Sequence, residues 1–120
     1  MKIEIITIHC QTNFGSAFQC FALHRFLTLK GFDNRVIDYR PEYIENSFGK
    51  GLKGLVKKLL FAWSIKEGKK KYNDFIFKNV RLTEKTYHNF DELKLSYDAP
   101  DILIAGSDQL WNTHYACGRD

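Results

Sequence analysis

The chain has 120 residues, a length at which one small domain can bury a sizeable core. A hydrophobic share of 44% and an aromatic share of 15% exclude an intrinsically disordered chain. The formal net charge of +4 is a mild excess that gathers between Lys50 and Lys71, and we expect no nucleic-acid partner.

The first half of the chain has the pattern of a β-α-β unit. Ile3 to His9 is apolar and β-branched, which predicts a buried parallel strand. Ser16 is expected to cap the helix that follows, and Gly31 to end it in a left-handed conformation. Arg35 to Tyr39 predicts the second strand, which Pro41 stops. The apolar stripe of the helix consists of Ala17, Cys20, Phe21, His24 and Leu27, widened by Phe18 and Ala22.

Two helical segments are expected next. Between Lys50 and Phe61, leucines repeat at helical spacing and lysines fill the other face. This basic segment either packs its leucines on the domain or lies against an anionic lipid surface. A second helical stretch is expected from Ile65 to about Asn79, weakly interrupted at Gly68.

The last predicted elements are short. Asp91 to Leu93 is expected to be a helix with Asn89 as a possible cap, and Ile102 to Ala105 a buried strand. Taken together, the pattern predicts an α/β fold, a Rossmann-like parallel sheet flanked by helices.

The segment from Gly106 to Asn112 directly follows the last predicted strand and is the most site-like stretch of the chain. Such loops bind ligands in open α/β sheets. Asp108 is either a general base on an acceptor hydroxyl or a helix cap. Trp111 either stacks on a sugar ring or packs under the loop. With Asp108 as the candidate catalytic residue, the candidate binding residues here are Gly106, Ser107, Gln109, Trp111 and Asn112.

The turn after the first strand is the second candidate site. A dinucleotide-binding turn needs three glycines, and this turn has only Gly15. In such a fold Asp38, at the end of the second strand, would bind a ribose. Without the other glycines, Asp38 is better interpreted as a hydrogen-bonded turn residue. The helix N-terminus still favours an anionic or hydroxyl-rich ligand. His9 either binds an anion, relays a proton or bonds to neighbouring backbone. The candidate binding residues of this turn are His9, Asn13, Gly15, Ser16 and Gln19, with capping as the alternative for Asn13 and Gln19.

The cysteines and the other histidines indicate no metal site. Cys10, Cys20 and Cys117 are widely spaced without a Cys-x-x-Cys pair, and His24 is expected to be a core histidine. No secretion signal precedes the first strand, and no apolar run approaches the ~18 residues of a spanning helix. We therefore expect a cytoplasmic protein.

Three segments, in order and at matching spacing, resemble the polysaccharide pyruvyl transferase family. They are Ile5 to His9 with the Asn13–Ser16 turn, Val36 to Pro41, and Gly106 to Asn112, where Leu110 is the one conservative departure. The resemblance covers the whole chain, although residues 48–95 match only in general character. It implies that residues 1–120 are the N-terminal, acceptor-side part of a two-domain enzyme with a glycosyltransferase-B-like architecture.

The resemblance also implies an activity. Members of the family transfer a pyruvyl group from phosphoenolpyruvate, without a further cofactor, to a sugar of a cell-surface polysaccharide or its precursor, forming a ketal. The acceptor saccharide, free or lipid-linked, would lie against this part, and the donor-binding residues would lie beyond residue 120, so residues 1–120 alone are expected to be inactive. The alternatives are a glycosyltransferase that uses a nucleotide sugar and a non-catalytic Rossmann-like ligand-binding module.

Overall fold

The computed structural model describes residues 1–10, 13–41, 52–96 and 99–106, with the backbone alone for 52–62, 65, 95 and 96. Within these residues the elements are, in chain order, β1 (Ile3–Ile6), α1 (Phe14–Leu29), β2 (Asn34–Tyr39), α3 (Leu52–Asn79), β3 (Leu82–Tyr87), α4 (Phe90–Ser96) and β4 (Ile102–Ala105). The four described strands form one parallel sheet in the order β3-β2-β1-β4. The predicted α/β class and the parallel neighbours of β1 are confirmed.

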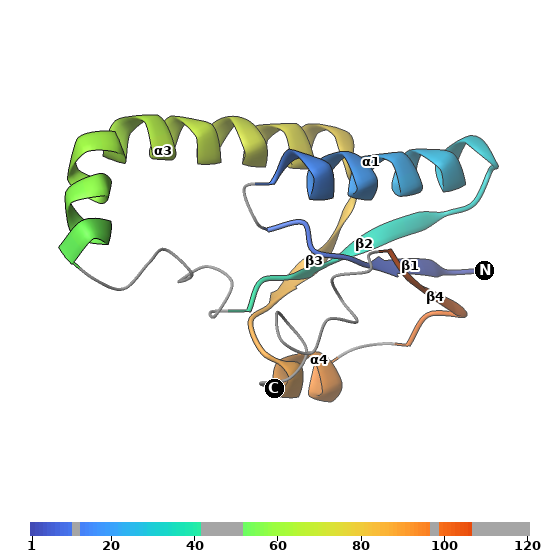
Figure 1. Ribbon diagram of the computed structural model, residues 1–120. Coiled ribbons are helices and arrows are strands. Elements are labelled where there is room, and N and C mark those ends of the chain that lie inside the picture. The colour runs from blue at the N-terminus through green and yellow to red at the C-terminus, as the bar shows by residue number, and fades with distance from the viewer. Residues whose placement is uncertain (11–12, 42–51, 97–98, 107–120) are drawn as a thin grey trace.

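The helices lie on both faces of the sheet (Figure 1). α1 and α3 contact each other over one face, and α4 lies on the other face beside β3. α3 also projects past the carboxyl edge of the sheet, the edge at which the strands end (Figure 1). Among the described residues, no helix has both the length and the apolarity needed to cross a membrane.

The core lies between the sheet and the two helices that contact each other. β-branched side chains of β1 and β2 point toward small or apolar side chains of α1 and toward one face of α3, as expected for a sheet covered by helices. The buried cluster comprises Ile3, Ile5, Ala17, Cys20, Leu27, Val36, Tyr72, Ile76 and Val80.

α1 begins two residues before the predicted cap. Its N-cap is Asn13, whose side-chain oxygen accepts a hydrogen bond from the Gly15 amide at 2.9 Å, so the prediction of Ser16 as the cap is wrong. An asparagine caps a helix as well as a serine does, and here it comes first in the chain. The end of α1 is as predicted, because Gly31 takes a φ of +83°.

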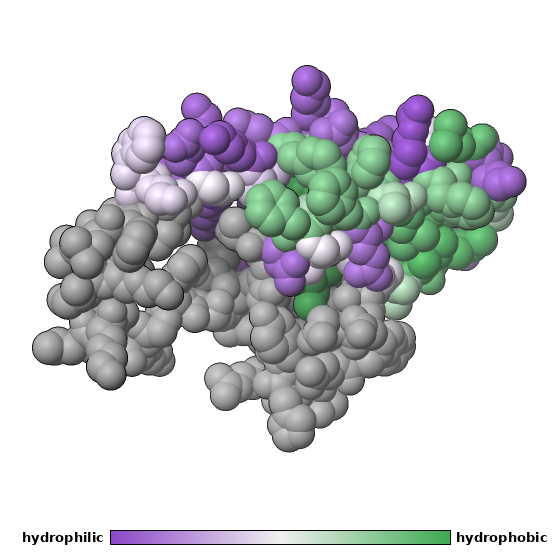
Figure 2. Space-filling view, turned by 45° about the horizontal axis from the view of Figure 1, so that its top comes forward, coloured by the Kyte–Doolittle hydropathy of each residue, from purple (hydrophilic) through white to green (hydrophobic). Residues whose placement is uncertain are grey.

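The apolar stripe of α1 is narrower than predicted. Ala17, Cys20 and Leu27 are buried, but Phe18 is 59% exposed, since the sheet and α3 cover only one side of α1. Phe18 contacts α3 through an edge-to-face pair with Phe75, whose ring centroids lie 5.6 Å apart. Figure 2 shows the resulting apolar surface along α1, with hydrophilic side chains along α3. The most exposed apolar residues of α1 are Phe14, Phe18, Phe26 and Leu29.

The middle of the chain differs most from the prediction. One helix, α3, replaces the two predicted segments, runs through Gly68, and bends near its N-terminal end (Figure 1). β3 was not predicted, because an edge strand with exposed Glu84 and Lys85 lacks the apolar run of a buried strand. The helix predicted around Asp91 is confirmed as α4, and Asn89 caps it by accepting from the Glu92 amide at 2.8 Å.

Strand pairing brings particular residues opposite each other near the carboxyl edge. The register between β2 and β3 shifts between Val36 and Asp38, so that Val36 pairs with Leu82 and Asp38 with Thr86. Across this irregularity the Asp38 amide donates to the Thr83 hydroxyl at 2.9 Å. Such irregularities re-aim side chains next to functional sites.

Candidate functional site

The strand order reverses between β1 and β4. From β1 the chain passes through α1, on one face of the sheet, to β2, whereas β4 is reached from β3 through α4, on the other face (Figure 1). In open α/β sheets, ligands bind in the crevice outside the carboxyl ends of the strands at such a switch point. The two loops predicted to form a site leave β1 and β4, the strands on either side of it.

Gly106 is the first residue after β4 and packs directly against β1 and α1. Its amide donates to the Ile6 carbonyl at 2.9 Å, which extends the pairing with β1 by one residue. A Cβ atom at this position would lie 3.2 Å from the Cβ atom of Thr7 and 3.1 Å from a methyl carbon of Leu23. A side chain at this position would therefore be tightly packed, and Thr7 and Leu23 would have to shift by a few tenths of an ångström.

The N-terminus of α1 lies at the same edge, because α1 follows β1. Asn13, Gly15 and Gln19 are exposed there, and Ser16 is half-buried. The side-chain oxygen of Asn13 is occupied by capping, which favours the structural alternative for this residue. The remaining predicted residues, Ser107, Asp108, Gln109, Trp111 and Asn112, lie outside the described residues.

His9 lies beyond the end of β1 and is only 1% exposed. Its Nε2 bonds to the Asp38 carboxylate at 2.8 Å and its Nδ1 to the Thr7 carbonyl at 3.2 Å. Both partners are acceptors, so each of these contacts is made with the ring nitrogen as the donor when that nitrogen carries the hydrogen. The structure thus places His9 in contact with neighbouring backbone and with β2.

Asp38 accepts hydrogen bonds from three side chains. Oδ1 accepts from His9 and from Nε of Arg40 at 2.6 Å, and Oδ2 accepts from the Thr86 hydroxyl at 2.8 Å. Burial alone would raise the pKa of Asp38, but these bonds and the charge of Arg40 outweigh it and lower the pKa to about 2. Asp38 is therefore an ionised, fully bonded residue, as its structural interpretation predicted.

Sequence reasoning missed Arg40 and Thr86. Arg40 is two residues after Asp38, a spacing that puts both side chains on the same face of an extended strand, and this was the available signal. Thr86 belongs to the edge strand that was not predicted. With His9, these residues form a polar cluster over the carboxyl ends of β1, β2 and β3, next to the switch point.

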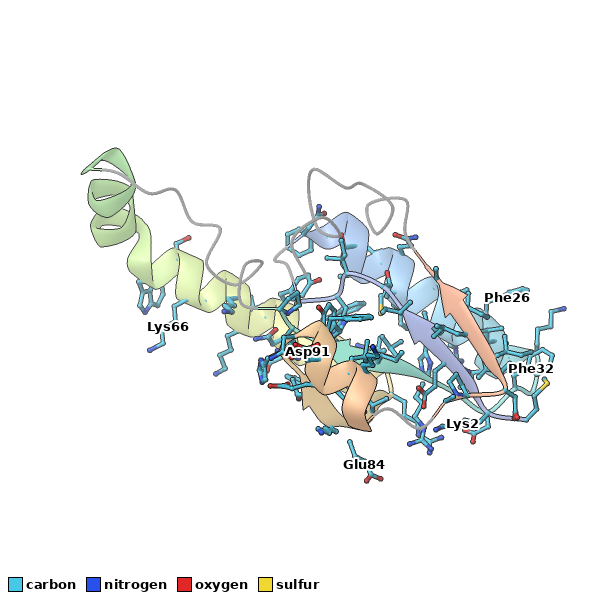
Figure 3. All side chains as sticks on the ribbon, turned by 90° about the horizontal axis from the view of Figure 1, so that it is seen from below. Lys2, Phe26, Phe32, Lys66, Glu84 and Asp91 are labelled. Atoms are coloured by element: carbon cyan, nitrogen blue, oxygen red, sulfur yellow. The ribbon has the colours of Figure 1, made fainter. Side chains whose placement is uncertain are left out.

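The other candidates are structural. His24 donates from Nδ1 to the Asn34 side chain at 2.6 Å and accepts from the Arg81 amide at Nε2, so it is hydrogen-bonded as predicted, but it is half-buried and lies outside the core cluster. Burial raises the pKa of Cys20 to about 12, which keeps it an unreactive thiol. Side chains in Figure 3 fill the space between the elements, with Lys2 and Phe32 at the amino edge and Lys66 far past the opposite edge.

A small hollow of about 120 Å³ lies between α1 and α3 and is almost wholly apolar. It is lined by Phe14, Ala17, Phe18, Lys71, Tyr72 and Phe75. In the part of the chain that the structure describes, no group of three or more His, Cys, Asp or Glu could hold a metal ion. The lining of this hollow contains none of the residues of the polar cluster around Asp38.

Comparison of the chain with protein-family models, with curated proteins and with solved structures gave no match. The motifs and their positions at the carboxyl edge of the sheet are therefore the observations that bear on function.

Proposed function

We propose that the chain is the acceptor-side, Rossmann-like part of an enzyme that transfers a pyruvyl group from phosphoenolpyruvate to a sugar. One observation supports this most: the three resembling segments are at the carboxyl ends of β1, β2 and β4, which are adjacent strands around the switch point. Gly106, the first residue of the third segment, bonds to Ile6 of the first at 2.9 Å, at the edge of the sheet where such folds bind ligands.

The proposed reaction needs few groups from the protein. Two hydroxyls of one sugar add to C2 of phosphoenolpyruvate, C3 takes up a proton to become a methyl group, and inorganic phosphate leaves. No group of the protein is oxidised or reduced when the ketal forms. In this proposal Asp108, outside the described residues, deprotonates an acceptor hydroxyl, and general-base assistance of this kind is typically worth about 10²–10⁴-fold in rate.

The setting of the enzyme is part of the proposal. A lipid-linked acceptor would bring the protein to the inner face of the membrane, where the basic segment from Lys50 to Phe61 would contact anionic lipid. The side chains of that segment lie outside the described residues. A second domain that completes a glycosyltransferase-B-like cleft would supply most of the donor site.

The direct test offers two donors to the protein encoded by the open reading frame that carries this sequence. Phosphoenolpyruvate and a mixture of nucleotide sugars are incubated separately with acceptor oligosaccharides. The proposal predicts inorganic phosphate and a pyruvyl ketal in equal amounts, with the ketal methyl group detected by NMR, from phosphoenolpyruvate alone. A new glycosidic bond from a nucleotide sugar, without any ketal, would establish the glycosyltransferase alternative instead.

A further inference from the structure

Arg40 is held in one orientation at the carboxyl edge of β2. Its amide donates to the Tyr87 carbonyl at 2.7 Å, and its Nε donates to Asp38 at 2.6 Å. The centre of its guanidinium group lies 5.4 Å from the centroid of the Phe77 ring, a cation–π contact with α3. Its side chain is 17% exposed, so its position is set by neighbours and not by solvent.

These contacts use one side of the guanidinium group. Only Nε of the side chain bonds to another group among the described residues, which leaves the two terminal nitrogens and their hydrogens unbonded there. A planar guanidinium group offers paired donors that match the oxygens of a carboxylate or a phosphate. The fixed orientation means that little side-chain entropy is lost when such an anion binds.

Asp38 does not engage the terminal nitrogens of Arg40. Its Oδ1 accepts from Nε of Arg40 at 2.6 Å and contacts Nε2 of His9 at 2.8 Å, and its Oδ2 accepts from the Thr86 hydroxyl. The bonding capacity of the carboxylate is therefore used by Nε and by two other side chains, which leaves the terminal nitrogens for a second group.

Tyr72 of α3 has a buried hydroxyl. It is 2% exposed, and no described residue bonds to its hydroxyl. Burial raises the pKa of Tyr72, and the charge of Arg40 acts in the opposite direction. An unpartnered buried donor is uncommon in a folded protein.

We propose that the terminal nitrogens of Arg40 bind a phosphate or carboxylate group of a substrate at the carboxyl edge of the sheet. Asp38 and Phe77 position the guanidinium group and His9 positions Asp38. The identity of the anion depends on the proposed function: phosphoenolpyruvate has both groups, and an activated acceptor has a phosphate. From the sequence, we expected the donor-binding residues to lie beyond residue 120. In this proposal Arg40 is an anion-binding residue within residues 1–120.

The test is an NMR titration of the chain with inorganic phosphate and, separately, with pyruvate, at constant ionic strength. We expect saturable shifts of the Arg40 Nε–H signal and of the amides of Arg40 and Thr86. Arg40→Lys keeps the charge but loses the paired donors, and should weaken binding at least about tenfold. Tighter binding of phosphate or of pyruvate identifies which group Arg40 takes.

Arg81 provides the matched control. It also pairs with an aspartate, Nη1 to Asp33 at 2.7 Å, but at the amino edge of the sheet. Arg81→Lys should leave both affinities unchanged. Equal losses in the two variants, or shifts that do not saturate, would overturn the proposal.

A third variant covers the case in which Arg40→Lys does not fold. Phe77→Leu removes the ring beside the guanidinium group, and Phe77 is 60% exposed, so the fold should tolerate the change. Binding should weaken about threefold, and unchanged binding would count against the assigned geometry. None of these titrations requires turnover, so a failure here is distinguishable from a failure to form a ketal.

Discussion

At the scale of single residues, the polar cluster at the carboxyl edge illustrates how a buried carboxylate is kept ionised. Asp38 is on β2, between β1 and β3, and its side chain is only 7% exposed. Hydrogen bonds from three side chains replace the water that an exposed carboxylate would have. A buried ion pair adds stability only when its geometry is good and its remaining lone pairs are bonded. Here both carboxylate oxygens are bonded, and the cluster links β1, β2 and β3.

This arrangement predicts how stability depends on pH. The pKa of Asp38 is lowered from 3.8 to about 2 in the folded chain, so between these values the unfolded chain binds more protons and stability rises with pH. The contribution of the ionised group is fully present above pH 4 and is lost as the pH falls toward 2. It amounts to about 2 kcal/mol.

Asp38→Asn removes the charge and serves as the test. Its free energy of unfolding in urea at pH 7 should be lower than that of the parent chain by about 2 kcal/mol. The difference should shrink below pH 4 and nearly vanish at pH 2. A difference that stays constant from pH 7 to pH 2 would show that shape, and not charge, explains the loss.

At the scale of elements, the apolar strands were predicted and the polar strand was not. β4 has the predicted bounds, but the prediction that it is buried is wrong: it is an edge strand, and Ile102 and Leu103 are 40% and 53% exposed. β2 starts one residue early, and β1 ends at Ile6 because Thr7 to His9 leave the strand pairing. β3 is the other edge strand and has no apolar run, since it carries exposed Glu84 and Lys85. The exposure of Phe18 could not be predicted either, since it depends on where α3 packs.

Two glycines provide a matched test of packing at this scale. Gly68 is inside α3, and a Cβ atom there would meet nothing within 4 Å, whereas a Cβ atom at Gly106 would press on Thr7 and Leu23. Gly68→Ala should raise the free energy of unfolding by about 0.5–1 kcal/mol, because glycine is the poorer helix former.

Gly106→Ala should lower the free energy of unfolding by about 1 kcal/mol, since the backbone and Thr7 must move to fit a methyl group. Thermal unfolding of both variants next to the parent chain measures the two effects. A neutral Gly106→Ala would mean that the turn after β4 is loosely packed and that its glycine is kept for ligand approach alone.

At the scale of the whole molecule, strand order gives the site its position. The β3-β2-β1-β4 order puts the switch point between β1 and β4, which no local pattern in the sequence specifies. The sequence predicted the two loops because their polar residues are unsuited to a core. It could not predict the cluster around Arg40, because Thr86 is brought to Asp38 by β3 and Phe77 is brought to Arg40 by α3.

We proposed that Asp108, in the loop after β4, deprotonates an acceptor hydroxyl, and Asp108→Asn in the protein that carries this sequence tests that role. Asparagine caps a helix about as well as aspartate but cannot act as a base, so the variant separates the two interpretations of Asp108. Steady-state ketal formation is measured for both proteins after their folding has been checked by thermal unfolding. The account predicts an unchanged unfolding temperature and a loss of at least about a hundredfold in kcat. A folded variant with near-normal kcat would contradict it.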